Sequence, residues 1–335
     1  MEQTISRERL DLSTFSDKVA AIRADIGRYV VGQEEAVELL LAAIISDGHV
    51  LIEGVPGIAK TLLAKVLSRL IDARFGRLQF TPDLMPSDVL GTSIYDPKSQ
   101  SFTFRRGPVF TQVLLVDEIN RAPAKTQAAL FEVMEERQAT VDGTTYPMDD
   151  FFCIFATQNP IEQEGTYKLP EAQLDRFILK ITMQYPSRQE EVEILRRHQV
   201  RERMDIAHLK PILTPEDIRA MRQLLDNVVV DEAILRYIAA IAYETRTSRN
   251  LYLSASPRAS VALLRLSKAY ALLHGRDFVT PDDVKQLTPA VLSHRIVLTA
   301  EAEMEGMTVS RAIQSILETA QVDAEMPPIP LNNNR

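Results

Sequence analysis

The chain has 335 residues, of which 45% are hydrophobic and 25% are charged, a composition typical of a globular protein of about two domains. The formal net charge of −8 argues against a protein whose whole surface binds nucleic-acid backbone. The single cysteine excludes a disulfide framework or a cysteine-based metal cluster. Because Cys153 lies in the apolar run 151–155, we expect a buried, reduced thiol.

No segment of the sequence indicates export or membrane insertion. The N-terminus lacks the basic stretch and following apolar stretch of a secretory signal. The apolar stretch 37–45 is too short to cross a bilayer. We therefore expect a cytoplasmic protein that does not insert into membranes.

The first elements in chain order are two helices, a strand and a third helix. Apolar residues recur at three- and four-residue steps over 10–29, which predicts an amphipathic helix. After a short break, a second helix is expected over 34–45. The apolar run 50–52, the Gly-rich segment 54–61 and a helical pattern over 62–70 then predict a strand, a loop and a helix.

The further strands are mostly apolar rather than alternating in polarity, which predicts a parallel sheet covered by helices on both faces. They are expected at 77–80, 113–116, 151–156 and 177–181. Two segments interrupt this order, 93–105 and 138–148, and each has β-prone arms around turn residues. The Asp142-Gly143 pair in the second is a strong hairpin signal. We expect both segments to be β-hairpins that project from the sheet domain.

After residue 186 no strong strand pattern follows, and helices are predicted instead. They are expected at about 187–199, 215–225, 231–245, 257–274 and 281–291. Several begin at a Thr-Pro or Ser-Pro pair, which is typical of an N-cap followed by proline at the first helical position. We therefore predict an α/β domain at 1–186, an all-helical domain at 187–322 and a disordered tail at 323–335.

The Gly-rich segment has the residues needed to hold nucleotide phosphates. Gly54 and Gly57 would let the backbone wrap around phosphate groups. Lys60 would bridge the β- and γ-phosphates, and the hydroxyl of Thr61 would bind Mg²⁺. The strict motif has glycine before the lysine, where this chain has Ala59, but alanine keeps the backbone N–H that serves as the donor. The alternative interpretation is an ordinary turn before a helix.

Two adjacent carboxylates follow the predicted strand 113–116. The end of a parallel strand would bring Asp117 to the sheet edge where the phosphate loop also lies. Asp117 would then hold the water shell of Mg²⁺, and Glu118 would orient and polarise an attacking water. The alternative is a solvated turn, where both residue types are common.

These motifs resemble those of AAA+ ATPases, and the Ala-Lys-Thr form of the loop resembles the MoxR branch. The matching segments are 54–61 (GVPGIAKT), 113–122 (VLLVDEINRA), 156–165 (ATQNPIEQEG) and 169–177 (LPEAQLDRF). The resemblance covers roughly residues 15–300. It implies a Mg²⁺-dependent ATPase with an α/β P-loop core, two inserted hairpins (one interrupting helix 2) and a C-terminal helical lid, with ATP or ADP between core and lid.

The resemblance also assigns individual roles. The implied nucleotide-binding residues are Val31, Gly32, Gly54, Val55, Pro56, Gly57, Ile58, Ala59, Lys60, Thr61 and Leu62, and the implied Mg²⁺ ligands are Thr61 and Asp117. Asn159 matches sensor 1, which helps to place the attacking water, although an Asn-Pro turn is the alternative. Arg258, at the start of a predicted lid helix, matches sensor 2, although a solvated arginine is the alternative.

Arg176 matches the arginine finger, a residue that one subunit supplies to the γ-phosphate held by its neighbour. Such a group stabilises charge that develops in the transition state. The alternative is a surface ion pair with Asp175 or Glu171, and Arg106 and Arg121 are further candidates for the finger. A finger in trans implies a ring of identical subunits, hexameric by the resemblance and assembled with nucleotide.

Three functions fit this pattern. The first is a MoxR-like chaperone that remodels, assembles or matures protein complexes, including metal centres, with a protein client or a metal-binding adhesion-type partner. The second is a nucleic-acid motor, which the acidic composition disfavours and for which the hairpins offer little beyond Lys98, Arg105 and the preceding Arg137. The third is a magnesium-chelatase-type ATPase subunit. The locally basic segment 196–203 is interpreted as a solvated helix face.

Overall fold

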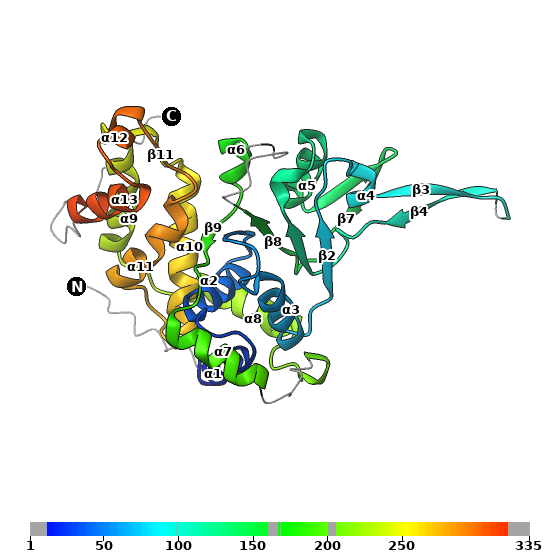
Figure 1. The fold of residues 1–335 in the computed structure, drawn as a ribbon, viewed down its shortest axis with the longest axis horizontal. Coiled ribbons are helices and arrows are strands. Elements are labelled where there is room, and N and C mark those ends of the chain that lie inside the picture. The colour runs from blue at the N-terminus through cyan, green and yellow to red at the C-terminus, as the bar shows by residue number, and fades with distance from the viewer. Residues whose placement is uncertain (1–11, 99, 160–166, 168, 200–205, 321–335) are drawn as a thin grey trace, which may run out of the picture.

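The computed structural model describes residues 12–98, 100–159, 167, 169–199 and 206–320. The tail at 323–335, predicted to be disordered, and residues 160–166 lie outside this described part. Within it, no helix is both long enough and apolar enough to cross a membrane. Figure 1 shows a central sheet with lid helices on one side and a long hairpin arm on the other.

The central sheet has five parallel strands in the order β2-β5-β8-β1-β9. They are β1 (Val50–Glu53), β2 (Phe75–Gln79), β5 (Val113–Asp117), β8 (Cys153–Gln158) and β9 (Leu179–Thr182). The predicted strands are confirmed, although the strand expected at 77–80 begins earlier, because Phe75 and Gly76 also pair with β5. This order brings the carboxyl ends of β5, β8 and β1 side by side.

Helices cover both faces of the sheet. Because side chains alternate along a strand, Val50 and Ile52 belong to one hydrophobic core and Leu51 belongs to the other. The first core includes residues of α1 (Ser13–Tyr29), α2 (Glu34–Ile45), α3 (Lys60–Leu70) and the lid, and the second includes residues of α5 (Ala124–Glu136). The apolar strand pattern therefore correctly predicts a sheet that is buried on both sides.

The lid is a helical bundle that packs against α2 and the edge strand β9. Its helices are α8 (Pro215–Leu224), α9 (Glu232–Thr247), α10 (Pro257–Leu273), α11 (Pro281–Leu292), α12 (Ala300–Met304) and α13 (Val309–Thr319). As predicted, Thr214, Ser256 and Thr280 are N-caps that accept a hydrogen bond from a backbone N–H in the first turn. The lid also contains a short antiparallel pair, β10 (Leu251–Leu253) and β11 (Val297–Leu298), which is too short to show a sequence pattern.

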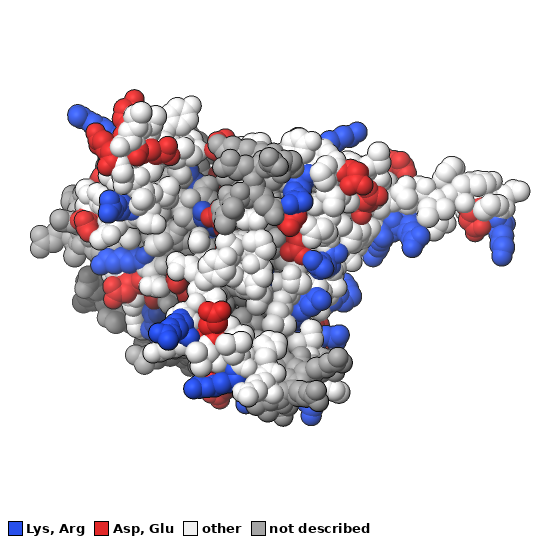
Figure 2. All heavy atoms as spheres, in the orientation of Figure 1, with Lys and Arg blue, Asp and Glu red and all other residues white. Residues whose placement is uncertain are grey.

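The two predicted hairpins are present. The first follows α4 (Pro86–Leu90) and consists of β3 (Gly91–Asp96) and β4 (Ser101–Arg106), and the second consists of β6 (Gln138–Val141) and β7 (Thr144–Pro147). The first forms the long arm in Figures 1 and 2. Asp142 and Gly143 form the turn of the second with φ values of 51° and 77°, as a type I′ turn requires. Phe104 stacks on Tyr146, with ring centroids 4.1 Å apart, and so joins the two hairpins.

Two buried polar side chains, those of His49 and Cys153, lie near the start of β1. The Nδ1 atom of His49 accepts a hydrogen bond from the N–H of Ile154 (3.0 Å), and its Nε2 atom contacts the carbonyl of Met134 (3.2 Å). Burial lowers the pKa of His49 to about 3, so the ring stays neutral and can act as an acceptor. Cys153 is buried as expected, and burial raises the pKa of its thiol to about 12.

Candidate functional site

The Gly-rich loop connects β1 to α3 and is attached to the neighbouring strand. The N–H of Gly54 donates to the carbonyl of Gln158 at the end of β8 (3.3 Å). The Nζ of Lys60 donates to the carbonyl of Gly54 (2.6 Å), so the ammonium group lies across the loop. The first N–H groups of α3 have no acceptor within the helix and lie at the positive end of its dipole. This arrangement suits the binding of phosphate groups.

The backbone conformation of Ala59 shows why the strict motif has glycine before the lysine of this loop. Its backbone has φ 63° and ψ 21°, in the left-handed region, which costs an L-residue about 1–2 kcal/mol. Gly57 also has positive φ, at 87°. Gly54 is required for a different reason, because a Cβ there would lie 2.9 Å from the carbonyl oxygen of Met183. The loop therefore keeps glycine at two of its constrained positions and tolerates strain at the third.

Asp117 ends β5 as a buried carboxylate that is 7% exposed. Its Oδ2 accepts a hydrogen bond from Nε of Arg77 on β2 (2.7 Å), and its Oδ1 accepts one from the hydroxyl of Thr157 on β8 (3.2 Å). Both neighbouring strands therefore orient this side chain. A carboxylate held in this way is a suitable ligand for a hard divalent cation.

Glu118 directly follows, with φ 56° and ψ 52°, a conformation that turns the chain sharply away from β5. Its N–H donates to the hydroxyl of Thr157 (3.0 Å), so one threonine orients both acidic residues. Its Oε2 lies 2.8 Å from Nε of Arg121. Arg121, a further candidate for the finger, thus pairs with a carboxylate of its own subunit. Arg106, the other candidate, lies over the ring of Phe110, 5.2 Å from its centroid.

Asn159 follows the last residue of β8 and is 7% exposed. In the sheet, β8 lies between β5 and β1. Asn159 is therefore located between the strand that ends in Asp117 and the strand that leads to the Gly-rich loop. The strand order thus agrees with the prediction that Asp117 and the Gly-rich loop lie at one edge of the sheet, and it adds Asn159 to that edge.

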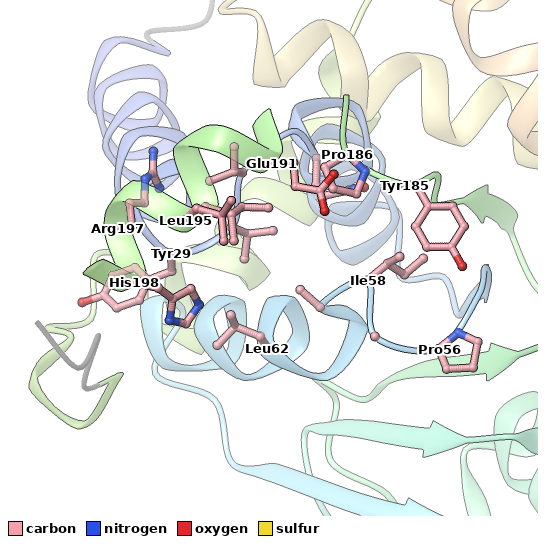
Figure 3. Close-up of a pocket in the computed structure, with 16 residues that line it drawn as sticks. Tyr29, Pro56, Ile58, Leu62, Tyr185, Pro186, Glu191, Leu195, Arg197 and His198 are labelled. Carbon is pink, nitrogen blue, oxygen red and sulfur yellow. The ribbon is translucent and has the colours of Figure 1, made fainter. Parts of the chain in front are cut away.

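A hollow of about 990 Å³ lies between the Gly-rich loop, the α1–α2 junction and α7 (Arg188–Gln199), as Figure 3 shows. Its size suits a nucleoside. Six of the predicted nucleotide-binding residues line it, namely Val31, Pro56, Gly57, Ile58, Ala59 and Leu62. The others, Gly32, Gly54, Val55, Lys60 and Thr61, are not among its lining residues. Gly32 has φ 72°, and a Cβ there would lie 2.5 Å from the carboxyl group of Glu190.

The other residues that line this hollow were not predicted from the sequence. They are Tyr29, Val30, Gln33, Tyr185, Pro186, Glu191, Ile194, Leu195, Arg197 and His198. The helix predicted at 187–199 is confirmed as α7, and the spacing of 191, 194, 195 and 198, which is that of one helix face, is the signal that could have identified this face as part of the site. Tyr185 and Leu195 are 71% and 64% exposed, so they offer apolar surface that a bound base would cover.

The predicted position of ATP between core and lid stays a prediction, and the hollow involves only part of the predicted lid. Within the described part of the chain, α7 is the only helix of the predicted 187–322 domain that lines the hollow, and α8–α13 do not. The cause is packing, because the later lid helices lie against α2 and β9 instead.

The interpretation of 196–203 as a solvated face is also incomplete. The side chain of Arg196 is 72% exposed, but that of Arg197 is 27% exposed. The Nη1 of Arg197 donates to the carbonyls of Gly27 and Arg28, each at 2.8 Å. These carbonyls lie near the C-terminal end of α1, where the helix dipole favours a cation. Arg197 therefore fixes α7 to α1, and residues 200–203 lie outside the described part.

Arg176 and Arg258 meet at a third residue, Glu135 of α5. Nη1 of Arg176 lies 2.7 Å from Oε2 of Glu135 and donates to the carbonyl of Phe131 (2.8 Å). Nη2 of Arg258 donates to Oε1 of the same glutamate (2.6 Å). Neither arginine is among the residues that line the hollow. The fold thus brings the two predicted catalytic arginines to each other.

Arg176 is flanked by a residue that connects it to the lid. Asp175 follows the short helix α6 (Glu171–Leu174) and forms an ion pair with Arg295 at 2.7 Å. The other carboxylate oxygen of Asp175 accepts a hydrogen bond from the hydroxyl of Ser256, the N-cap of α10 (2.9 Å). Because α10 carries Arg258 in its first turn, both arginines belong to one network. No sequence motif identifies Glu135 or Arg295 as part of it.

Comparisons with known proteins show to which family the chain is similar. Residues 49–179 match the family described as "ATPase family associated with various cellular activities (AAA)", and residues 243–318 match the AAA lid domain. The chain is similar to YeaC of Bacillus subtilis, with 45% identity over 90% of this chain and 93% of that protein. It is similar to chaperone MoxR1 of Mycobacterium tuberculosis, with 43% identity over 88% of this chain and 80% of the relative. A crystal structure of a protein from Cytophaga hutchinsonii assigned as an ATPase superposes with a TM-score of 0.86 at 40% identity, covering 92% of this chain and 96% of that one.

Proposed function

The chain belongs to the MoxR-type branch of the AAA+ ATPases, and we propose that it hydrolyses ATP with Mg²⁺ in a ring of identical subunits to remodel protein complexes. The observation that carries the proposal is the meeting of the Gly-rich loop, Asp117, Glu118 and Asn159 at one sheet edge. This set combines N–H groups that can donate hydrogen bonds to phosphates, ligands for a metal ion, and groups that can orient water.

The phosphates would bind at the Gly-rich loop, on the N–H groups from Gly57 to Leu62, with Lys60 leaving the carbonyl of Gly54 to contact the β- and γ-phosphates. Thr61 and Asp117 would hold Mg²⁺, which neutralises charge on the phosphates when it is bound. The position of Asp117 supports this assignment, because its carboxylate is oriented from both sides.

The base and ribose would occupy the hollow beside the loop. Val31 and Leu62 offer apolar contacts from the core, and Leu195 offers them from α7. Gly32 supports this reading, because its positive φ makes the tight turn that leads from α1 to α2. We place the sheet domain at 1–186 and the lid at 187–322, and α7 is then the lid helix that contacts the base.

The attacking water would be oriented by Glu118 as general base and by the amide of Asn159. Glu118 pairs with Arg121 at 2.8 Å and must release it, or share it, to accept a proton from water. The left-handed backbone at Glu118 supports a functional role, because strained conformations of this kind cluster at active sites.

Arg176 and Arg258 would act together on the nucleotide of a neighbouring subunit. Two features support this assignment. Both arginines bind Glu135, and neither lines the hollow of its own chain. A shared carboxylate keeps two cations close together despite their mutual repulsion. A site that needs both halves is completed only in an oligomer, and we propose a hexameric ring that assembles with nucleotide.

The work done by the ring would be the remodelling or maturation of protein complexes in the cytoplasm, including the insertion of metal centres with a metal-binding adhesion-type partner. The similarity to a protein named chaperone MoxR1 supports a protein client. Acidic groups are interspersed with basic ones on the face in Figure 2. Arg137, which precedes the second hairpin, donates to the carbonyl of Phe152 and pairs with Asp47, so it supports no nucleic-acid contact.

The experiment that tests the proposal compares Glu118→Gln with Glu132→Gln, an exposed glutamate of α5. We expect the first variant to bind ATP with unchanged affinity but to hydrolyse it about 10²-fold or more slowly, because it lacks the base. The second variant should behave as the wild type does. Lys60→Ala should abolish nucleotide binding.

Near-normal turnover by Glu118→Gln would remove that residue from the catalytic role. Salt-sensitive stimulation of the wild type by single-stranded DNA would favour a nucleic-acid motor instead. Stimulation by a chelatase partner would favour the third function.

A further inference from the structure

Arg295 is a buried cation whose hydrogen-bonding groups are all engaged. Its side chain is 3% exposed and lies in the lid just after α11. A guanidinium group has five N–H groups, and each of them here has an acceptor. The acceptors are Asp175 Oδ1 (2.7 Å), the carbonyl of Asp175 (3.2 Å), and the carbonyls of Phe177 (2.6 Å), Ile178 (3.1 Å) and Val291 (2.6 Å).

These acceptors lie on both sides of Arg176. The carbonyls of Asp175 and Phe177 flank it directly, and the same Nη2 atom of Arg295 binds both of them. His294 adds a contact from its Nε2 to the carbonyl of Phe177 (3.0 Å). The backbone at residue 176 is therefore held from the lid.

The lid also holds the side chain that would act together with Arg176. Ser256 donates to Asp175 from the N-terminus of α10, and Arg258 in the first turn of the same helix donates to Glu135. In Figure 1, α6 and the start of β9 lie beside the lid helices that supply these groups. Asp175 is thus the point at which two lid elements, α10 and the end of α11, join the segment that carries Arg176.

We propose that Arg295 is a positioning residue that fixes Arg176, together with Arg258, in the geometry needed to reach the nucleotide of a neighbouring subunit. This inference rests on the proposed function, because it presupposes that Arg176 acts in trans. It follows that the lid and the arginine pair of one subunit move as a unit. A movement of α10 and α11 would then change hydrolysis in the neighbouring subunit.

A purely structural role for Arg295, as a link between lid and core, makes a different prediction. A structural link that fails lowers stability and disturbs the subunit that contains it. A positioning residue for a group that acts in trans leaves the nucleotide site of its own subunit intact. The loss of ATP turnover then occurs at the nucleotide site of the neighbouring subunit. The two roles are therefore separated by mixing subunits.

The test uses Arg295→Lys, which keeps the charge but supplies three donors instead of five. We expect unchanged ATP affinity, and turnover about 10²-fold lower, the loss that a displacement of about 1 Å can cause. The control is Arg276→Lys. Arg276 also makes a two-point ion pair, with Asp283 at 2.6 and 2.8 Å, and its hydrogen-bond acceptors in the described part of the chain, Asp283 and Phe278, both belong to the lid. The Arg276→Lys variant should be less stable than the wild type but should not show this loss of turnover.

Mixing experiments then locate the defect. A Glu118→Gln subunit cannot hydrolyse ATP but carries an intact Arg176, so it should restore turnover when mixed with Arg295→Lys subunits. Arg176→Ala subunits should fail to restore it. If Arg176→Ala is rescued by Glu118→Gln but Arg295→Lys is not, or if Arg295→Lys alone is fully active, the inference is wrong while the proposed function stands.

Absence of rescue for Arg176→Ala itself would overturn the trans role of that residue and the inference with it. Should Arg295→Lys not fold, as judged by circular dichroism and thermal unfolding, Asp175→Asn takes its place. That variant keeps the volume and one oxygen acceptor but removes the ion pair with Arg295. It should show the same rescue pattern, and normal turnover would equally overturn the inference.

Discussion

Ala59 stands where the backbone of the Gly-rich loop enters the left-handed region, with φ 63°. The residue beside it, Lys60, begins α3 and supplies the cation of the loop. A methyl group at this position does not interfere with the N–H donors, but it disfavours the conformation that aims them. The chain therefore tolerates a local strain in the loop that would hold the phosphates.

We predict that Ala59→Gly stabilises the protein by about 1 kcal/mol, because glycine adopts positive φ without the steric penalty. The ATP affinity should change little, since the backbone donors are the same. Unfolding by urea and titration with a fluorescent ATP analogue measure the two quantities.

The matched control is Ala239→Gly, at an exposed position inside α9. There the same change should destabilise the protein by about 1 kcal/mol, because glycine is unfavourable in a helix interior. If both variants are destabilised equally, residue 59 does not carry backbone strain.

The helix α7 contributes lining residues to the hollow, although no sequence motif marks them. It begins just after β9 and places one face against the hollow, while Arg197 fixes it to α1. Leu195 lies on this face and is 64% exposed, whereas Val192, 41% exposed on the same helix, does not line the hollow. Substitutions at these two residues can therefore measure how much this face contributes to ATP binding.

Leu195→Ala should weaken ATP binding about fivefold to tenfold and leave the maximal rate unchanged, because it removes apolar surface that covers the base but touches no reacting group. Val192→Ala should leave both quantities unchanged. Steady-state kinetics with saturating Mg²⁺ measure the KM and kcat of each variant. A fall in kcat with an unchanged KM would contradict the assignment of the hollow to the base.

The elements themselves were largely predictable from the sequence. Uniformly apolar strands, Thr-Pro and Ser-Pro caps and the Asp142-Gly143 turn are local signals, and each is confirmed in the structure. The loop, Asp117 and the adjacent Glu118 could also be located at one edge, because the carboxyl ends of parallel strands lie at the same edge of a sheet. The network of Glu135 and Arg295 could not, because its members come from α5 and the lid, and only tertiary packing brings them to Arg176.

At the scale of the whole molecule, the predicted catalytic groups form two sets. One set lies at the carboxyl edge of β1, β8 and β5, next to the hollow. The other consists of Arg176 and Arg258, held at Glu135 and connected through Asp175 to the lid. We infer that one subunit provides the first set and its neighbour the second. Active sites would then be completed between subunits.

ATP turnover per subunit, measured with saturating Mg²⁺ as the protein concentration rises, tests this inference. For the wild type we predict a steep rise to a plateau, because more subunits then have a neighbour that supplies Arg176. Arg176→Ala should stay low at every concentration and reach a plateau about 10³-fold lower. A rate per subunit that is already maximal at the lowest concentration, or a normal plateau for Arg176→Ala, would contradict this inference.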